Sequence, residues 1–510
     1  MLALGITIKD EESTVTGRLK SERKAPEVVK YIMQPFLADL GEYFDVHLKI
    51  HKAHVVMLCE QELLSGDEAR TLLEAMRAMG DAGQEGLGDS VDTDLYMKME
   101  GFVTALAGEL GGKMHMGRSR NDLYATGARI MTRGKLIALL ADVIELQQVI
   151  LRRAGEHIDT VMPGYTHLQH AEPITFGHYL LAFHDAIARD VTRGWAAYDN
   201  TNLNALGAAA LSASSFDLDR ERTAALLGFS GLIENSYDAV ASRDYIVESV
   251  AMLATLSANI ARVADNFILW STSEFDMIDL PDEYGYTSSI MPQKRNPGYF
   301  LESVRSKSAR VTGNLMSVLA TLKGTPFAQS RDTSYEITVS AFDAFTEATG
   351  IVNVMRGVVA AVSPKRENMA SNCAGEFSGS TEIANTIVRE TGLPFRSAYK
   401  VVATVVRQAA AAGMRPGAVT AQTIDAAAIE VLGRPVGLTE SQVRDALDPA
   451  RNVEMKKTVG GPSRHSIEAM LRSRHVASGL AARNLADRQS ALRSADAGLE
   501  QAITAICAKT

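Results

Sequence analysis

Apolar residues recur at every third or fourth position over most of the chain, which is the spacing of one face of an α-helix. The segment 134–157 (GKLIALLADVIELQQVILRRAGEH) carries this spacing without a proline, and the same pattern returns in 174–195, 246–270 and 301–324. These segments are well above the mean helix length of about 11–12 residues. Strand signals are weak throughout. The pattern predicts an all-α fold built on a bundle of long central helices.

Several of these helices are apolar on more than one face, so both faces must be buried, partly by other subunits. The most apolar segment is 246–270, and its longest run without a charge is Ser249–Ala261. That run is too short to span a bilayer. We therefore interpret the segment as a buried helix of a large bundle and expect no membrane contact.

The chain divides into three blocks. Residues 1–117 hold shorter helices and end in a glycine-rich stretch, and residues 118–370 hold the long helices. In residues 371–510 the helical pattern shortens, with breaks at glycine and proline, until a final stretch rich in alanine and arginine predicts a terminal helix.

Composition narrows the class of protein. The formal charge of −9 is not offset by any basic block, which argues against a partner such as nucleic acid or an anionic membrane. The three cysteines, Cys59, Cys373 and Cys507, lie far apart and suggest neither a metal site nor a disulfide framework. The N-terminal residues do not read as a signal peptide. We expect a cytoplasmic protein that needs no cofactor or metal.

Three polar clusters are candidates for chemistry. The first is GRSRND (117–122), at the start of the first long helix. Ser119, Arg120 and Asn121 offer a hydroxyl, a forked cation and an amide beside the free N–H groups of a helix start, which suits a carboxylate. The alternative is an ordinary helix N-cap with a solvated arginine.

The second cluster is PGYTHLQHAEP (163–173), which lies between two prolines just before a helix. It offers His167 as an acid–base group, with possible polar support from Thr166, Gln169, His170 and Glu172. A structural histidine is the alternative. His167 and His170 also have a spacing that suggests a metal site, but no third ligand is evident, so we predict none.

The third cluster is TSSIMPQKRNP (287–297), in which Pro292 and Pro297 argue against regular structure. Glycines at 285 and 298 would let it move as a lid over a ligand. Lys294 and Asn296 suit an anion, which leaves Ser288 or Ser289 free to react. An exposed turn is the alternative.

Taken together, the three clusters resemble the argininosuccinate lyase branch of the fumarase/aspartase superfamily. The third is similar to that superfamily's GSSxMPxKxN loop, with Thr287 in place of the glycine. Further similar stretches are ENSYDAVASRDY (234–245), ILWSTSEF (268–275), RSKSARV (305–311) and GLPFRSAY (392–399). The resemblance implies an all-helical homotetramer with a twenty-helix core, in which each active site is built from three subunits.

The resemblance also implies the reaction, a reversible β-elimination that releases fumarate from an N-substituted aspartate. Ser288 matches the family's base and His167 its histidine, with Glu302 as the partner of that histidine. Lys294 and Asn296 match the groups that stabilise the carbanion. The remaining residues that we expect to contact substrate are Ser119, Arg120, Asn121, Thr166, Gln169, Ser289, Met291, Gln329 and Arg331.

Three departures bear on the substrate and on the pairing of Glu302. TDLY stands where the family usually has EDIH, so that Tyr96 replaces a histidine, and one residue is inserted between Asn296 and Glu302. The stretch FAQSRDTSYEI (327–337) stands where relatives read LAYNKDLQEDK, whose tyrosine, glutamine and lysine contact the arginine half of their substrate. Gln329, Ser334 and Ile337 occupy those three positions.

We therefore expect argininosuccinate to be a poor substrate, because each lost charged hydrogen bond removes about 1.5–3 kcal/mol of recognition. An aminopolycarboxylate such as ethylenediamine-N,N′-disuccinate fits better, with Arg331 as an extra carboxylate clamp or else a solvated surface residue. The alternatives are an ordinary argininosuccinate lyase and a catalytically silent, crystallin-like homologue.

Overall fold

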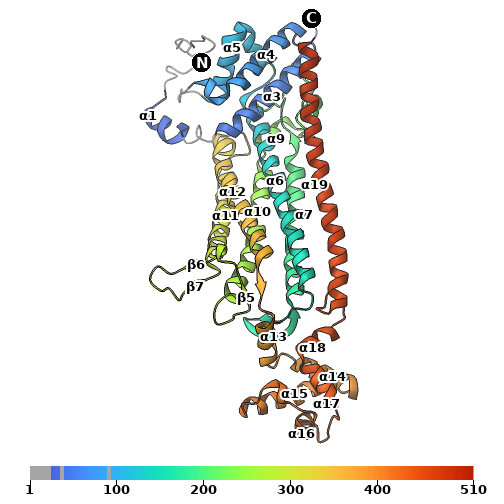
Figure 1. Ribbon diagram of the computed structural model, residues 1–510. Coiled ribbons are helices and arrows are strands. Elements are labelled where there is room, and N and C mark those ends of the chain that lie inside the picture. Colours follow the sequence, from blue (N-terminus) through green and yellow to red (C-terminus); the bar gives the residue numbers. More distant parts are fainter. Residues whose placement is uncertain (1–23, 35–39, 89–93, 509–510) are drawn as a thin grey trace.

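The computed structural model describes residues 24–34, 40–88 and 94–508. It confirms the predicted all-α fold. Figure 1 shows an elongated bundle of long helices with a group of shorter helices at each end. The long helices are α6 (Arg120–Glu156), α7 (Phe176–Thr201), α10 (Asp244–Trp270), α11 (Tyr299–Lys323) and α12 (Ile337–Ala361).

The five long helices share the largest hydrophobic core of the described chain, which also includes Ile467 and Leu471 of α19. None of the five contains a proline, so each hydrogen-bond ladder runs uninterrupted. The four segments with helical spacing all lie in this group, which explains why their apolar residues are so regular.

Two short segments, α1 (Pro26–Val28) and η1 (Val29–Met33), have no buried residue. The helices that follow them contribute to a second core: α3 (Leu40–Glu60), α4 (Gly66–Ala82), η2 (Gln84–Leu87), α5 (Leu95–Ala107) and η3 (Gly108–His115). The last helix, α19 (Arg464–Cys507), runs along the bundle in Figure 1 and ends among them. Its residues Leu499, Ile503 and Ile506 are part of the N-terminal core.

A third core lies at the opposite end of the bundle, where α14 (Ser380–Thr391), α15 (Phe395–Ala411), α16 (Ala421–Leu432) and α17 (Glu440–Leu447) pack together. The segment η6 (Pro416–Ala418) connects α15 to α16, and α13 (Arg366–Gly375) and α18 (Pro449–Met455) contribute no residue to this core. The division at 117 and 370 stays a prediction. Helix α19 contributes to two cores and so belongs to no single block.

Short segments connect the long helices. They include α8 (Arg220–Leu226), α9 (Ser236–Ala241), η4 (Asp282–Tyr284) and η5 (Asp332–Glu336). Four two-stranded ladders also occur: β1 (Val161–Thr166) with β2 (Gln169–Thr175), β3 (Leu203–Asn204) with β4 (Gly231–Leu232), β5 (Ile278–Asp279) with β8 (Ser363–Pro364), and β6 (Tyr286–Thr287) with β7 (Arg295–Asn296).

The prediction that 287–297 lacks regular structure is wrong at both ends of the segment. Tyr286 pairs with Asn296, and Thr287 pairs with Arg295. The two prolines lie outside the paired positions: Pro292 in the loop between the strands and Pro297 directly after β7. They therefore cost the ladder no hydrogen bond.

The bundle leaves apolar side chains uncovered. Helix α10 is long and apolar enough to cross a membrane by length and composition, yet only half of its most apolar window is buried in one chain. Core helices of large bundles pass the same test. On α11 and α12, Met316, Leu319, Val339 and Val354 are exposed. Both observations are expected of a chain that packs against further subunits, and the homotetramer stays a prediction.

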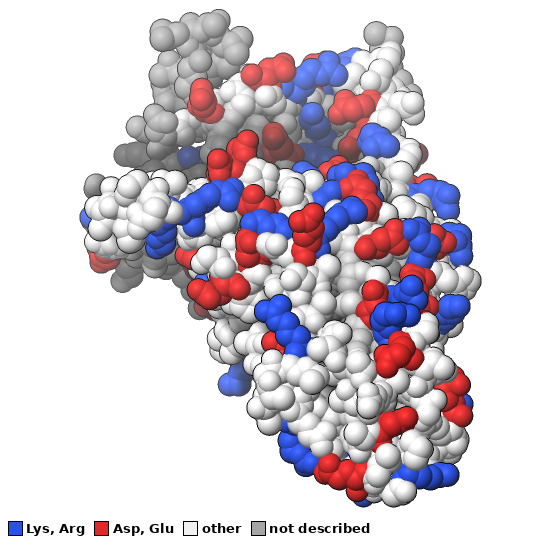
Figure 2. Space-filling view, turned by 60° about the horizontal axis from the view of Figure 1, so that its bottom comes forward, with Lys and Arg blue, Asp and Glu red and all other residues white. Residues whose placement is uncertain are grey.

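The charged surface is mixed. On the face seen in Figure 2, Lys and Arg side chains lie among Asp and Glu side chains rather than in one continuous basic area. Opposite charges on that face therefore lie within reach of one another, and long-range attraction for a polyanion is weak there.

Candidate active site

The first two polar clusters lie at opposite ends of the bundle. Ser119 caps the N-terminus of α6, while Thr166 and His167 follow its C-terminus. Helix α6 has 37 residues, and at 1.5 Å per residue it spans about 55 Å. One chain therefore does not bring Ser119 to the same pocket as His167. A site that uses both must take them from different chains.

At the first end, Ser119 forms a complete capping box. Its Oγ accepts a hydrogen bond from the Asn121 amide at 3.3 Å, and its own amide donates to Asp122 Oδ1 at 3.0 Å. The other oxygen of Asp122 accepts from the amides of Gly207 and Ala209. Burial raises the pKa of Asp122 to about 6, against the opposing effect of Arg118. The N-cap interpretation is thus correct for Ser119, and the remaining N–H groups of the helix start still suit an anion.

Arg120 and Asn121 already have partners within the chain. The Arg120 guanidinium donates to a carboxylate oxygen of Asp94, the N-cap of α5. Asn121 Nδ2 donates to the carbonyl of Ala210 at 3.0 Å. The Arg120 side chain is nevertheless 50% exposed, so the alternative of a solvated arginine stays open. A substrate carboxylate at this helix start would share Arg120 with Asp94.

At the second end, Thr166 and Gln169 pair at the close of the β1–β2 hairpin. The two residues between them, His167 and Leu168, have φ of 53° and 60°. This left-handed pair fits a two-residue hairpin turn, which normally takes asparagine or glycine. Backbone strain of this kind clusters at functional sites. It places the His167 side chain on an exposed tip.

The hairpin borders a cavity of about 670 Å³ lined by Thr166, His167 and an aromatic wall of Tyr165, Tyr179, Trp270 and Phe275. The His170 Nε2 lies 3.2 Å from the hydroxyl of Tyr165. Within the part of the chain that the structure describes, no three His, Cys, Asp or Glu side chains are grouped to hold a metal ion.

The loop between β6 and β7 projects from the side of the bundle in Figure 1. Ser288 Oγ accepts hydrogen bonds from the amides of Ile290 at 3.3 Å and Met291 at 3.1 Å. Two N–H donors aimed at one hydroxyl oxygen stabilise its deprotonated form. Ser289, Met291 and Lys294 are exposed on the same loop. This geometry favours Ser288 over Ser289 as the reactive hydroxyl.

Glu302 lies in the first turn of α11 and is exposed. Within the described part of one chain it forms no ion pair with His167. The pair therefore stays a prediction for an assembly in which the two residues come from different chains.

The segment that departs from the family, 327–337, lies beside the start of α6, with the rings of Tyr124 and Tyr335 5.0 Å apart. Gln329 accepts from Arg243 at 3.1 Å and also bonds to Ser334 Oγ. Ile337 is fully buried. Gln329, predicted to contact substrate, thus has its side chain engaged within the chain.

Arg331 remains available at this end. Its side chain is 48% exposed and only 3.9 Å from Glu336. Its guanidinium lies over the ring of Tyr335, 5.2 Å from the centroid. Arg331 is therefore open to solvent, and its role as an extra clamp for a substrate carboxylate stays a prediction.

Comparison with known proteins identifies the family of the chain. A family model described as Lyase matches residues 45–313, and one described as Argininosuccinate lyase C-terminal matches residues 377–454. The chain is 41% identical to an argininosuccinate lyase of Methanococcoides burtonii over 84% of this chain and 86% of that protein. It is 34% identical to argininosuccinate lyase 1 of Shouchella clausii, over 94% and 97%.

Among solved structures, EDDS lyase in complex with formate superposes with a TM-score of 0.86 at 33% identity, over 95% of this chain and 96% of that one. A class II fumarase from Schistosoma mansoni gives 0.68 at 16% identity, over 86% and 96%, which supports the fold alone. The chain therefore belongs to the fumarase/aspartase superfamily, in its argininosuccinate lyase branch. It is a carbon–nitrogen lyase of that family, and membership implies a non-membrane protein; its compartment stays a prediction.

Two residues of the site had no role in the sequence interpretation. Asp94 accepts a hydrogen bond from Arg120. The sequence feature that could have indicated a role for Asp94 is its place directly before a helical pattern, where an acidic residue is typical of an N-cap. Arg295 lies inside the third cluster but was passed over between Lys294 and Asn296. Its contacts appear only when the loop is folded.

Proposed function

We propose that this protein catalyses reversible β-elimination of fumarate from an N-substituted aspartate, and that its preferred substrate is an aminopolycarboxylate such as ethylenediamine-N,N′-disuccinate. One observation carries the choice of substrate. The groups for the fumarate half are all present, whereas Gln329, Ser334 and Ile337 are turned into the chain and offer the amine half nothing.

The reaction follows from the chemistry of these groups. Ser288, held as an alkoxide by the amides of Ile290 and Met291, removes a proton from the carbon next to a substrate carboxylate. The electron pair moves onto that carboxylate, which becomes a dianion stabilised by Lys294 and Asn296. The pair then returns to form the double bond of fumarate while the C–N bond breaks and the amine leaves.

The remaining carboxylate of the fumarate half binds at the start of α6, where Arg120, Asn121 and free N–H groups meet. Thr166 and His167 come from another chain. His167 is the group for proton transfer at the nitrogen side or for relay to Ser288. The third cluster comes from a third subunit, as the resemblance to the family implies.

A carboxylate on the amine half has one candidate partner in Arg331. That cation is half exposed, and its ion pair with Glu336 is long. A new carboxylate at hydrogen-bond distance would bind it more strongly than Glu336 does, because charge-assisted hydrogen bonds weaken steeply with distance. An amine half that brings a carboxylate without a guanidinium is thus favoured, because the cationic side chain of arginine would be repelled by Arg331.

Argininosuccinate lyase is the second candidate, and it is favoured by the names of the similar curated proteins. A silent, crystallin-like role is the third. The backbone amides that donate to Ser288 argue against a catalytically inactive protein, because a loop that takes no part in catalysis has no need to stabilise an alkoxide.

The reverse reaction separates these candidates. The protein is mixed with fumarate and one amine from a panel that includes ethylenediamine, carboxylated diamines and arginine, and fumarate absorbance is followed. We expect a carboxylated diamine to be consumed at least about tenfold faster than arginine, a difference of about 1.4 kcal/mol. Arginine as the best amine would make the protein an argininosuccinate lyase. Fumarate left unconsumed by every amine would refute lyase activity.

The sharing of sites between chains has its own test. Arg120→Gln and Ser288→Ala are each expected to be nearly inactive. If the two variants are mixed, unfolded and refolded together, chains assort at random and roughly a quarter of sites recover both native residues. We expect activity to return to about that fraction. Each variant refolded alone is the control, and a mixture as inactive as the controls would contradict the assignment of these residues to different chains.

A further inference from the structure

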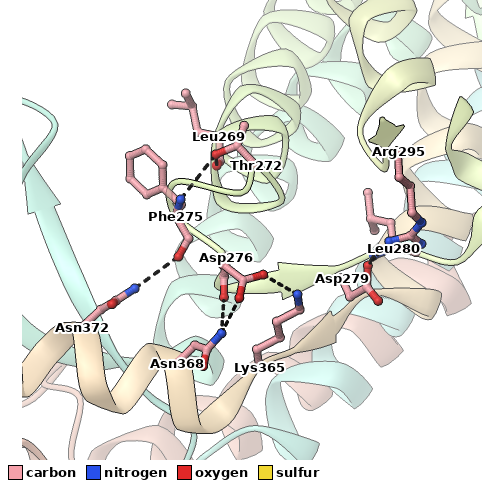
Figure 3. Close-up of polar contacts among 10 residues, drawn as sticks. All are labelled: Leu269, Thr272, Phe275, Asp276, Asp279, Leu280, Arg295, Lys365, Asn368 and Asn372. Carbon is pink, nitrogen blue, oxygen red and sulfur yellow. Dashed lines mark hydrogen bonds and ion pairs between the residues drawn. The ribbon is translucent and has the colours of Figure 1, made fainter. Parts of the chain in front are cut away.

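Arg295 uses all three nitrogens of its guanidinium on one short segment that precedes the loop. Its Nε donates to Asp282 Oδ1 at 2.8 Å, its Nη1 to Asp279 Oδ1 at 2.7 Å, and its Nη2 to the carbonyl of Leu280 at 2.5 Å. Figure 3 shows the guanidinium directed at Asp279 and Leu280. A planar fork with three fixed donors defines position and direction, which a flexible ammonium does not.

The segment that receives Arg295 is itself fixed to the body of the protein. Asp279 belongs to β5, which pairs with β8. Three residues upstream, Asp276 bonds to Lys365 and to Asn368 on α13, as Figure 3 shows. Asn372 donates to the carbonyl of Phe275 at 3.2 Å. Arg295 thus ties the loop to a rigid support.

Because Arg295 lies in β7 between Lys294 and Asn296, its contacts with the protein body also affect these two neighbours. Arg295 and Asn296 are consecutive residues of β7, so their side chains point to opposite faces of the ladder. Holding Arg295 on the protein body therefore turns Asn296 away from it. Lys294 is joined directly to Arg295 on the other side, so its backbone is held at the same point.

The tie also reaches the proposed base. Arg295 pairs with Thr287 across the ladder, and Ser288 is the next residue along the chain. Ser288, Lys294 and Asn296 therefore all depend on one anchored position. Gly285 and Gly298 do not loosen the neck of the loop, because each is closely packed: a Cβ on Gly285 would lie 3.0 Å from the carbonyl oxygen of Asn296, and one on Gly298 3.2 Å from Ile268.

We propose that Arg295 is a positioning residue for the elimination, which sets the direction of Ser288, Lys294 and Asn296 through its contacts with Asp279, Asp282 and Leu280. The proposal rests on the proposed function for its kinetic effect and on the loop geometry alone for its structural effect. A purely stabilising role is a poor explanation, because the Arg295, Asp279 and Asp282 side chains are 40%, 44% and 88% exposed, and such pairs contribute little to stability.

The test uses Arg295→Gln and Arg295→Lys in the full-length protein, with Arg222→Gln as the matched control. Arg222 makes a two-pronged contact with Glu60, at 2.7 and 2.8 Å, far along the chain from the loop. With the amine that the panel identifies, Arg295→Gln is expected to lower kcat about 100-fold, the scale of a misplacement near 1 Å. The KM for fumarate should change by less than about threefold, because the carboxylate-binding helix start is untouched.

The lysine variant is expected to fall between wild type and glutamine, because it keeps the charge and loses the fork. Hydrogen exchange of the amides in 286–297 supplies a readout that needs no activity. We expect exchange there to speed up at least tenfold in Arg295→Gln and to be unchanged in Arg222→Gln.

Equal losses of kcat in Arg295→Gln and Arg222→Gln would overturn the proposal, and so would unchanged kcat or unchanged exchange in Arg295→Gln. If wild type consumes no amine, the proposed function fails, and the exchange measurement still decides whether Arg295 anchors the loop.

Discussion

Replacing Ser288 by alanine is expected to lower kcat by at least two to three orders of magnitude while the chain stays folded. The base contributes about 10²- to 10⁴-fold in reactions of this type. Ser288 is half-buried on a projecting loop, and water can accept hydrogen bonds from the two backbone amides once its hydroxyl is removed. Removing it therefore costs the fold little. Rates of fumarate release, with circular dichroism as the test of folding, measure both parts.

Ser289→Ala is the matched control for this variant, because it removes the neighbouring hydroxyl of the same exposed loop. We expect it to keep kcat within about tenfold of wild type, as no base is lost. If Ser289→Ala were the inactive variant and Ser288→Ala the active one, the base would be Ser289. Near-native activity in both would remove the serine loop from the chemistry.

The second large effect is loss of stability in acid, and it comes from a buried group that we call the Arg118 cluster: Arg118 with His47, His51, His54 and His115. Arg118 Nη2 donates to His51 Nδ1 at 2.7 Å, which requires a neutral imidazole. His54 Nε2 lies 2.9 Å from the carbonyl of Met116. Among the described residues, both ring nitrogens of His47 lack a hydrogen-bond partner.

Burial, reinforced by the charge of Arg118, lowers the pKa of His47 to about 3 and of His115 to about 4. The same causes hold the pKa of His51 and His54 well below the ordinary value. Unfolding restores a pKa near 6.5, so the unfolded chain binds more protons as pH falls. The stability is therefore complete above about pH 6.5 and declines progressively below it.

From pH 7 to pH 5, each fully buried neutral histidine costs about 2 kcal/mol. His47, His51 and His54 together give a loss on the order of 6 kcal/mol by the same rule. Asp122, whose pKa is raised to about 6, has the opposite sign and offsets about 1 kcal/mol. Against an ordinary domain stability of about 5–15 kcal/mol, this loss is large.

Denaturant unfolding at the two pH values, at one protein concentration, measures this loss. In His51→Gln the dependence on pH should be smaller by about a third, because one of three fully buried groups no longer titrates. His475→Gln, an exposed change on α19, should leave it unaltered. Equal unfolding free energies at pH 5 and pH 7 in wild type would contradict the account.

The fold was largely accessible from the sequence because the long helices bury apolar residues at a regular spacing. The β1–β2 hairpin was not, since His167 and Leu168 adopt a left-handed turn that their side chains disfavour. No local preference could indicate it; only the surrounding structure holds it. The β6–β7 ladder was not predicted for another reason. Each of its strands has only two residues, which is too short to show the alternation of apolar and polar residues that indicates a strand.

The sequence indicated which residues are candidates for the site, but not where they lie relative to one another in the fold. The resemblance singled out Ser288, whose role as the base stays a prediction, and the amides that donate to its hydroxyl are set by the fold of the loop. Gln329 was predicted to contact substrate because of its position in 327–337. In the structure, buried Arg243 donates a hydrogen bond to its side-chain amide oxygen. Contacts between distant segments decide such cases, and a single sequence does not contain them.

The shared helix α19 has a consequence for biogenesis. Leu499, Ile503 and Ile506 line the same core as residues near the beginning of the described chain, such as Tyr43 and Phe44. During translation those early residues leave the ribosome long before their final packing partners exist. The first helices to emerge must therefore keep apolar surface uncovered until nearly the whole polypeptide has been made. During that period a molecular chaperone can bind this apolar surface.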